Sequence, residues 1–462
     1  MSKFQVISPV DGNAYIDCQL HNSADIEKVL SSANNAQSSW RNLSVQERKP
    51  FIEKFILAFQ RMTARISEEL TWQMGRPISH TPIEVRGTVE RTKGMLNLAE
   101  NSLADVLVDE ISGFNRYIKR EPLGTVFVIP AWNYPYLISI NTIVPALLAG
   151  NAVILRHSAQ TPLVAERFSD AFQEAGLPDG LFQYLHLSHE DTANVIRDSR
   201  INFVSFTGSV SGGHQIQKVA AERFVGVGLE LGGKDPAYVC DDANLDFAIE
   251  NLVDGAFFNA GQSCCGIERI YVQEGVYDKF VEGFVEITKK YKLGNPLDKE
   301  TNIGPVAKKG GAESVKSQIK SAVEAGAKAL IDPRLFPQTE LGDNYLAPQV
   351  LVNVDHSMEI MTEESFGPVV GIMKVKDDEE ALSLMNDSEY GLTASIWTKD
   401  EERAISVGNK VETGTWFMNR CDYLDPFLSW TGVKNTGRGC TLSAVGYEQL
   451  TRPKSYHLRV KI

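Results

Sequence analysis

Two adjacent cysteines lie in a segment whose composition suits a reactive thiol. The segment FNAGQSCCGIERI (Phe258–Ile270) places Cys264 and Cys265 among small and polar residues, just before an apolar run. The thiolate is the nucleophilic form of cysteine and is accessible near neutral pH, whereas thiols packed in a core are inert. The pattern therefore raises the hypothesis of a nucleophilic cysteine, and core packing of some of the six cysteines is the alternative.

A lone carboxylate and a lone amide follow other apolar runs. In LELGGK, Glu230 ends an apolar run and precedes two glycines. Burial raises the pKa of a carboxyl group and suits it to general-base catalysis, although a structural ion pair is the other interpretation. In AWNYP, Asn133 is flanked by aromatic residues that would hold its amide in place, and simple capping of a turn is the alternative.

A glycine-rich segment, FTGSVSGG (Phe206–Gly213), lies between a predicted strand and a predicted helix. The helix is expected to carry one apolar stripe formed by Ile216, Val219, Ala220 and Phe224. Backbone amides at such a helix N-terminus bind phosphate groups, which indicates a nucleotide. The G-x-x-x-x-G spacing lacks the Lys-Ser/Thr of a P-loop, so an ordinary glycine-rich turn remains the alternative.

The order of predicted elements places these residues at strand ends. Residues 24 to 100 are predicted to be helical, with a capping box at Ser44–Glu47 and a helix end at Gly75 and Pro77. Strands are then predicted at residues 124–130, 151–156, 201–206 and 225–231, and in a second series at 267–272, 369–375, 393–398 and 414–419. Because helices separate the strands, we expect two α/β lobes with mostly parallel sheets and ligands beyond the carboxyl ends.

Composition narrows the classes of partner. The chain has 462 residues, 43% of them apolar, and a net charge of −13, which disfavours binding to nucleic acid or to an anionic membrane. The N-terminus lacks an apolar segment of secretory length and no long apolar run follows, so we expect a cytoplasmic protein with a small-molecule partner. The spacing of the cysteines indicates neither disulfides nor a zinc site, and no metal is expected.

Taken in order, the motifs resemble those of the NAD(P)-dependent aldehyde dehydrogenase superfamily. They are FTGSVSGG, LELGGK, GQSC and EESFGPV (Glu363–Val369), and the resemblance extends from ISPVDG near the start to GVKNTGRG (Gly432–Gly439). It implies an α/β fold with a Rossmann-type cofactor domain (1–112 and 123–232), an α/β catalytic domain (233–446) and a small β oligomerisation flap (113–122 and 447–462).

The resemblance also assigns roles to the catalytic candidates. Cys264 would attack the aldehyde, and the Asn133 amide with the backbone N–H of Cys264 would bind the resulting oxyanion. Glu230 would activate the water that releases the carboxylic acid from the thioester. Three alternatives stay open: a CoA-acylating enzyme, a non-catalytic binding protein on the same fold, and a Cys-His hydrolase.

The expected cofactor is NAD or NADP. The sequence RHSA (Arg156–Ala159) stands where the family usually has KPSE, so one acid is missing and an arginine suited to phosphate is present. The residues expected to bind the cofactor are Ile129, Ala131, Trp132, Arg156, Ser158, Ala159, Gly208, Ser209, Gly213, Leu231, Glu364 and Phe366.

Other departures concern the substrate. An Arg that binds the distal carboxylate in some members is replaced by Asn141, while Thr142 and Gly439 replace groups of family proton relays. The expected substrate pocket comprises Tyr134, Leu137, Asn141, Tyr423, Phe427 and Trp430, the last three from a mouth loop at 419–430. Its aromatic residues suit apolar or aromatic aldehydes, and its acids would suit an amino-aldehyde.

Two strand-like segments, Phe114–Pro122 and Ser455–Ile462, lie outside both α/β series. In the family the corresponding segments pair across subunits, which implies a homodimer or homotetramer. A ribbon packed on its own subunit is the alternative.

Overall fold

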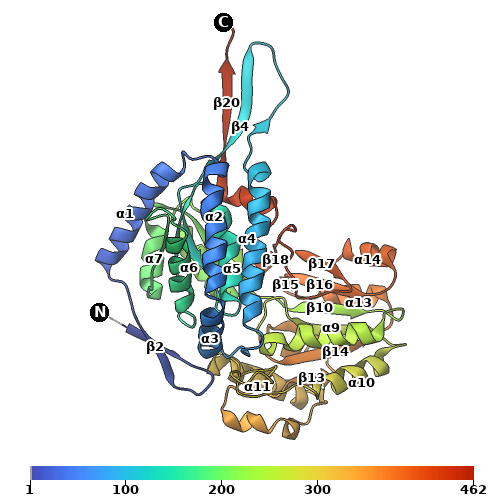
Figure 1. Cartoon of the computed structure of the whole chain (residues 1–462). Helices are drawn as coiled ribbons and strands as arrows, with labels where there is room; N and C mark the ends of the chain where they lie inside the picture. Colours follow the sequence, from blue (N-terminus) through green and yellow to red (C-terminus); the bar gives the residue numbers. More distant parts are fainter. Residues whose placement is uncertain (1–2) are drawn as a thin grey trace.

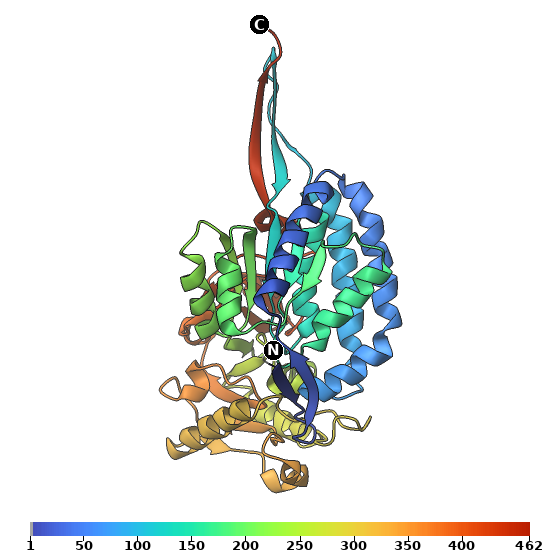
Figure 2. The same cartoon turned by 90° about the vertical axis from the view of Figure 1, so that its left-hand side faces the viewer.

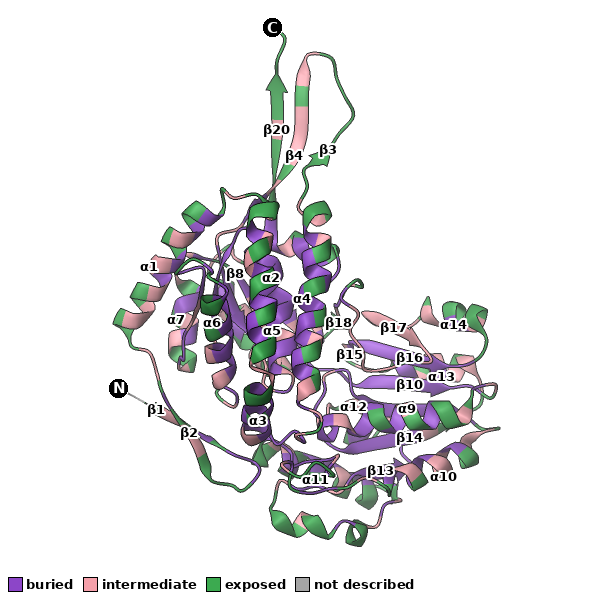
Figure 3. Ribbon diagram, viewed as in Figure 1, coloured by how far each residue is buried: buried purple, intermediate pink, exposed green. Residues whose placement is uncertain are grey.

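The computed structural model describes residues 3–462, which form two α/β lobes and a projecting β-ribbon (Figure 1). Each lobe is built on one mostly parallel sheet, as the alternation of strands and helices predicts. The inner strands of both sheets are largely buried, whereas β20 of the ribbon is largely exposed and β4 is mostly half-buried (Figure 3). The α/β fold expected from the sequence is confirmed.

The first sheet has six strands in the order β19-β9-β8-β5-β6-β7. All neighbours are parallel except β19 and β9, which pair antiparallel. The strands are β5 (Thr125–Ile129), β6 (Ala152–Leu155), β7 (Phe182–Tyr184), β8 (Ile201–Thr207), β9 (Gly226–Glu230) and β19 (Gly437–Arg438). Because β19 comes from near the C-terminus, the chain returns to the first sheet after building the second.

Helices pack around this sheet. They are α1 (Ser23–Trp40), α2 (Val45–Arg61), α3 (Thr63–Met74), α4 (Pro82–Ser102), α5 (Pro135–Leu148), α6 (Leu163–Glu174), α7 (His189–Arg197) and α8 (Val210–Ala220). The predicted capping box is present, because Ser44 and Glu47 bond reciprocally at the start of α2. Gly75 ends α3 with a φ of 80°, a conformation that glycine adopts without a steric penalty.

The second sheet has seven strands in the order β12-β13-β14-β11-β10-β16-β17. They are β10 (Asp235–Val239), β11 (Ile267–Gln273), β12 (Lys328–Ala329), β13 (Gln349–Val352), β14 (Val369–Val375), β16 (Thr393–Trp397) and β17 (Thr415–Met418). Its helices are α9 (Leu245–Phe257), α10 (Tyr277–Thr288), α11 (Lys309–Glu324), α12 (Glu359–Thr362), α13 (Asp378–Asn386) and α14 (Glu401–Gly408). The central strand β10 was not predicted, because its sequence DPAYV contains a proline and an acid.

The ribbon pairs β4 (Phe114–Pro122) with β20 (Thr451–Arg459) along their whole length, and the short β3 (Val106–Leu107) extends it. It projects from the body of the molecule in both views (Figures 1 and 2). The smaller elements are β1 (Lys3–Ile7) with β2 (Ala14–Gln19), β15 (Tyr390–Gly391) with β18 (Val433–Lys434), and 3-10 helices at Phe258–Gly261, Pro333–Leu335, Pro337–Leu341 and Val445–Leu450. The domain boundaries given above stay a prediction.

The apolar stripe predicted for α8 is wrong at its C-terminal end. Helix α8 ends at Ala220, and Phe224 lies beyond it in a turn with its side chain fully exposed. Ile216 and Ala220 are buried as expected. The stripe was extended one turn past the helix, where the helical period no longer determines which way a side chain points. No helix among residues 3–462 is long and apolar enough to cross a membrane.

Candidate active site

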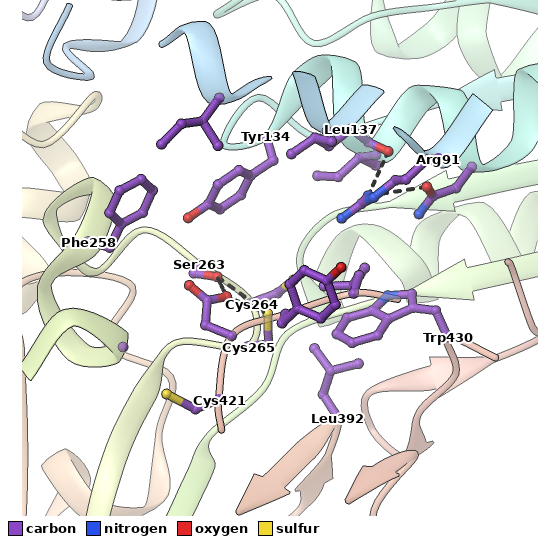
Figure 4. A pocket seen from close by; sticks show the side chains of 18 of the residues that line it. Arg91, Tyr134, Leu137, Phe258, Ser263, Cys264, Cys265, Leu392, Cys421 and Trp430 are labelled. Atoms are coloured by element: carbon purple, nitrogen blue, oxygen red, sulfur yellow. Dashed lines mark hydrogen bonds between the residues drawn. The ribbon is translucent and has the colours of Figure 1, made fainter. Parts of the chain in front are cut away.

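A cavity of about 430 Å³ contains the predicted nucleophile Cys264 (Figure 4) and is also lined by the predicted base. Cys264 and Glu230 both line it, together with residues of α4, α5 and the mouth loop. A volume of this size suits a small molecule. The structure therefore brings together residues that are 34 positions apart in the sequence.

The segment that carries Cys264 has a constrained backbone. Asn259, Ala260 and Gly261 have φ values of 54°, 56° and 70°, and for the two non-glycine residues this region costs roughly 1–2 kcal/mol each. A Cβ atom on Gly261 would lie 2.2 Å from the carbonyl oxygen of Gly367, so only glycine fits there. The side chain of Gln262 accepts a hydrogen bond from the Ala307 amide at 2.8 Å. The surrounding contacts thus hold the segment in one conformation.

A buried ion pair between Arg76 and Glu84 supports this segment from the first lobe. The two side chains are 2% and 0% exposed. Arg76 Nε donates to Asn259 Oδ1 at 3.1 Å, and Glu84 Oε1 accepts from the amides of Tyr136 and Leu137 at 2.9 and 3.2 Å. The carboxylate therefore caps the N-terminus of α5, where negative charge is favourable. Neither residue was predicted as part of the site.

Asn133 is buried beside the same segment. Its Nδ2 donates to the Gln262 carbonyl at 3.2 Å, and its own carbonyl accepts from Arg76 and Asn259. Because Nδ2 carries two hydrogens, one remains for a ligand. The backbone N–H of Cys264 has no acceptor among residues 3–462. Two N–H donors without an acceptor, one on the Asn133 side chain and one on the Cys264 backbone, thus belong to this segment and its neighbour.

The two adjacent thiols have different surroundings. Cys264 is partly exposed in the cavity, whereas Cys265 is 3% exposed and donates to Asp422 Oδ1 at 2.9 Å. Ser263 Oγ donates to the same oxygen at 3.1 Å. The pKa of the Cys265 thiol is raised well above its usual range by the hydrogen bond between Cys265 and Cys264, by burial and by the charge of Asp422. Cys265 is therefore held as a neutral thiol that packs against its neighbours.

Glu230 ends β9 and faces the cavity. Thr441 Oγ1 donates to its Oε1 at 2.6 Å, and Thr207 Oγ1 donates to its Oε2 at 3.2 Å. Burial raises the pKa of this carboxyl group above its ordinary value, and the two threonine hydroxyls oppose that shift. Neither threonine was predicted, because isolated threonines carry no distinguishing sequence signal.

The residues predicted to bind a cofactor follow the parallel strands of the first sheet. Ile129 ends β5 and precedes Ala131, Arg156 follows β6, Gly208 and Ser209 follow β8, and Leu231 follows β9. Ser209 caps α8, and the next two amides, of Val210 and Ser211, have no acceptor among residues 3–462. Free amides at a helix N-terminus suit a pyrophosphate. Gly213 lies against Leu231, where a Cβ atom would approach its methyl groups to 2.7 Å.

The predicted adenosine-ribose segment has one unpaired donor. Arg156 Nη2 donates to the Leu187 carbonyl at 3.3 Å, while its buried Nε has no partner among the described residues. Burial lowers the pKa of this guanidinium. The Ser158 hydroxyl accepts from the Gln160 amide at 3.4 Å, and Ala159 is exposed. An orphaned Nε at a strand end fits a sugar or phosphate oxygen.

The second lobe contributes the remaining cofactor candidates. Glu364 Oε1 accepts from the Gly233 amide at 3.1 Å, and burial with the nearby Glu268 charge raises the pKa of Glu364 to about 8. Phe366 has a φ of 50°, and its ring packs edge-to-face on Trp132 with centroids 5.7 Å apart. Trp132 and Phe366, predicted from distant segments, therefore come together.

Five of the six predicted substrate residues line the cavity, namely Tyr134, Leu137, Asn141, Tyr423 and Trp430. Phe427 does not, because its side chain is 54% exposed and its amide bonds to Asp425 in a turn that faces solvent. The structure therefore does not bring Phe427 together with the other five, and its role in the pocket stays a prediction. The sequence analysis also missed α4, whose Ile83, Gly87 and Arg91 recur every four residues on one face and line the cavity.

Known proteins are similar to this chain over nearly its whole length. A sequence model described as "Aldehyde dehydrogenase family" matches residues 1–456. The succinate semialdehyde dehydrogenase [NAD(P)+] of Escherichia coli strain K12 is 32% identical over 446 residues, which cover 96% of this chain and 95% of that protein.

Solved structures show the same similarity. The succinic semialdehyde dehydrogenase of Streptococcus pyogenes in complex with NADP+ is 28% identical, with a TM-score of 0.93 over 99% of this chain and 100% of that one. The betaine aldehyde dehydrogenase of Staphylococcus aureus in complex with NAD+ is also 28% identical, with a TM-score of 0.94 over 100% of this chain and 92% of that one.

Proposed function

Since the chain belongs to the NAD(P)-dependent aldehyde dehydrogenase family, whose members oxidise aldehydes, we propose that Cys264, Asn133 and Glu230 carry out this oxidation here. The observation that carries the proposal is that Cys264 and Glu230 line one cavity while Asn133 bonds to the segment before Cys264. The product is the carboxylic acid.

In the first step the Cys264 thiolate adds to the aldehyde carbon and forms a C–S bond, and the carbonyl oxygen becomes an oxyanion. The free N–H of the Asn133 amide and the backbone N–H of Cys264 donate to that oxygen. One such donor is worth roughly 3 kcal/mol of transition-state stabilisation. The buried Arg76–Glu84 pair and the constrained backbone at 259–261 support this role by fixing both donors before substrate arrives.

A bound NAD or NADP would supply the acceptor for the hydride, and loss of that hydride from the tetrahedral carbon held by Cys264 would give the thioester. Ser209 with the free amides of α8 would hold its pyrophosphate, and Glu364 would bind a ribose hydroxyl. Trp132 and Phe366 would flank the nicotinamide and exclude water from it.

In the last step Glu230 takes a proton from a water molecule, which attacks the thioester and frees the acid and the Cys264 thiolate. The raised pKa of Glu230 supports this role, since a base with a pKa closer to neutral transfers protons more effectively. Thr207 and Thr441 would orient its two oxygens.

The test is a pre-steady-state measurement of cofactor reduction with Glu230→Gln. We expect a burst of about one reduced cofactor per active site and then a stall, because the thioester forms but is not hydrolysed. Wild-type protein should turn over steadily with NAD or NADP. Steady, full-rate turnover by the variant would contradict the role of Glu230.

The CoA-acylating alternative is tested in the same assay by adding CoA. We expect CoA to leave the wild-type rate unchanged, because the base needed for hydrolysis is present beside the nucleophile. Formation of acyl-CoA in place of free acid would favour that alternative. The cavity lining contains no histidine among residues 3–462, so nothing in it favours the Cys-His hydrolase.

We further propose that the ribbon of β3, β4 and β20 pairs with other copies of this chain to form a dimer or tetramer. The support is that β20 is exposed along most of its length and offers an unpaired edge. Light scattering of the purified chain should give a multiple of 51.1 kDa. A monomer at micromolar concentration would contradict the proposal.

A further inference from the structure

Arg91 is a buried cation that faces the cavity. It lies on α4, is 9% exposed and lines the cavity with Cys264 and Glu230. Burying a guanidinium without an acid partner is costly, and most buried arginines are paired. Two acids act on its charge at longer range, namely Glu84, which is already paired with Arg76, and Glu230. Among residues 3–462 no carboxylate lies within ion-pair distance of Arg91.

The hydrogen bonds of Arg91 use only one of its three nitrogens. Nη1 donates to the Leu137 carbonyl at 2.9 Å and to Asn141 Oδ1 at 3.2 Å (Figure 4). Nε and Nη2 donate to no described residue, and neither is among the fully enclosed atoms that lack a partner. Together Nε and Nη2 form the edge of a guanidinium that binds a carboxylate through two parallel hydrogen bonds. Two contacts on α5 thus fix the side chain and leave its bidentate edge free.

Asn141 shows where the positive charge of the pocket comes from, which the sequence did not reveal. It occupies the position at which some family members carry an arginine for the distal carboxylate of the substrate, so a carboxylate site was not expected. In the structure Asn141 holds an arginine from the neighbouring helix instead. The positive charge is therefore present in the pocket but comes from α4.

We propose that Arg91 binds an anionic group at the far end of the aldehyde, a proposal that rests on the oxidation proposed above. The preferred substrates are then aldehydes bearing a carboxylate or a similar oxyanion. Asp422 also lines the cavity and would favour a cationic substrate. However, one of its oxygens already accepts from Ser263 and Cys265, and burial raises its pKa, which weakens its charge. Burial also lowers the pKa of Arg91, but the charges of Glu84 and Glu230 oppose that shift, and its Nε and Nη2 bond to no described residue.

The experiment compares kcat/KM for aldehydes that differ in the charge of the far end. The panel contains glyoxylate, succinic semialdehyde and glutaric semialdehyde as acids, glyceraldehyde 3-phosphate, pentanal as a neutral aldehyde and 4-aminobutanal as a cation. We expect wild-type protein to prefer one of the anionic aldehydes over pentanal by about 10- to 100-fold, the worth of a charge-assisted bidentate pair. The anionic aldehyde with the highest kcat/KM shows whether Arg91 binds a carboxylate or a phosphate group.

Arg91→Gln should remove most of that preference, chiefly through KM, and should change kcat/KM for pentanal by less than about threefold. Arg91→Lys should keep part of the preference, because the charge remains but the fork is lost. Lys93→Gln is the matched control, since Lys93 is exposed on the same helix and does not line the cavity.

Three results would overturn the proposal: a wild-type preference for pentanal or 4-aminobutanal, an unchanged preference in Arg91→Gln, or an equal loss for charged and neutral aldehydes, which would mean that Arg91 only joins α4 to α5. Failure of the proposed oxidation is distinguishable, because then no aldehyde in the panel would reduce the cofactor.

Discussion

The cavity has two walls that differ in how firmly they are held. One wall, which we call the catalytic wall, contains Phe258 and residues 263–265. It is held from behind by the buried Arg76–Glu84 pair and by the hydrogen bonds of Gln262 with Asn133 and Ala307. The mouth loop at 419–430 is anchored at Asp422 and Trp430, but its tip is exposed, with Phe427 and Leu428 at 54% and 61%. The difference indicates that the proposed catalytic residues are positioned before substrate binds, whereas the conformation of the loop tip is not fixed by such contacts.

The largest effect should come from the catalytic wall itself. Cys264→Ala removes the nucleophile, so kcat for aldehyde oxidation should fall by at least about 10⁴-fold while binding of the cofactor survives. Cys265→Ala is the matched control one residue away and should stay within about tenfold, because that thiol is buried and bonded to Asp422. Equal losses from both variants, measured by cofactor absorbance, would show that the two thiols act together.

The next effect concerns the support behind that wall. Arg76→Met leaves Glu84 buried and unpaired, which should cost about 3–5 kcal/mol of unfolding free energy. For a chain of this length that corresponds to a Tm lower by roughly 3–5 °C, measured by calorimetry, with a loss of activity as Asn259 is released. The control Arg61→Met breaks an exposed pair with Glu174 and should change Tm by less than about 1 °C. An unchanged Tm in Arg76→Met would mean that the wall is held by other contacts.

A smaller effect should appear in the pH dependence. Glu230 must be ionised to act as a base, so the rate of thioester hydrolysis should rise with pH through its raised pKa. Thr441→Val removes a hydrogen bond that favours the ionised form, so the pKa of Glu230 rises further and the acid limb moves to higher pH.

The rate of Thr441→Val at pH 6 should therefore be roughly 3- to 10-fold below that of wild type, while the alkaline plateau is retained. Profiles of kcat against pH measure both quantities. A shift of the acid limb to lower pH, or a uniform loss at every pH, would show that Thr441 does not act through Glu230.

The same contrast explains what the sequence could predict. Glu230 and Gly208 end or follow apolar runs and Cys264 precedes one, all within recognisable motifs, so their types and their places beside strands could be predicted together. Arg76, Glu84 and Arg91 could not, because a charged residue in a loop or on a helix is normally solvated and only tertiary packing buries these three. The side chains of Phe224 and Phe427 are exposed where the sequence suggested contacts, since both lie in turns where no period fixes the direction of a side chain.

The smallest effect should come from the tip of the mouth loop. Phe427→Ala should change kcat/KM for each aldehyde by less than about twofold, because the ring contacts solvent and does not line the cavity. Trp430→Ala is the contrasting variant from the same loop. Its ring is 5% exposed and lines the cavity, so its truncation should cost roughly 3–5 kcal/mol of stability and impair binding of substrate.

A loss of tenfold or more in Phe427→Ala, restricted to kcat/KM for apolar aldehydes, would mean that the tip folds over bound substrate. The catalytic wall would then be ordered before substrate binds, and the tip of the mouth loop would become ordered only when the aldehyde binds. An unchanged kcat/KM would instead confine substrate recognition to α4, α5 and the anchored ends of the loop, where the free edge of Arg91 lies.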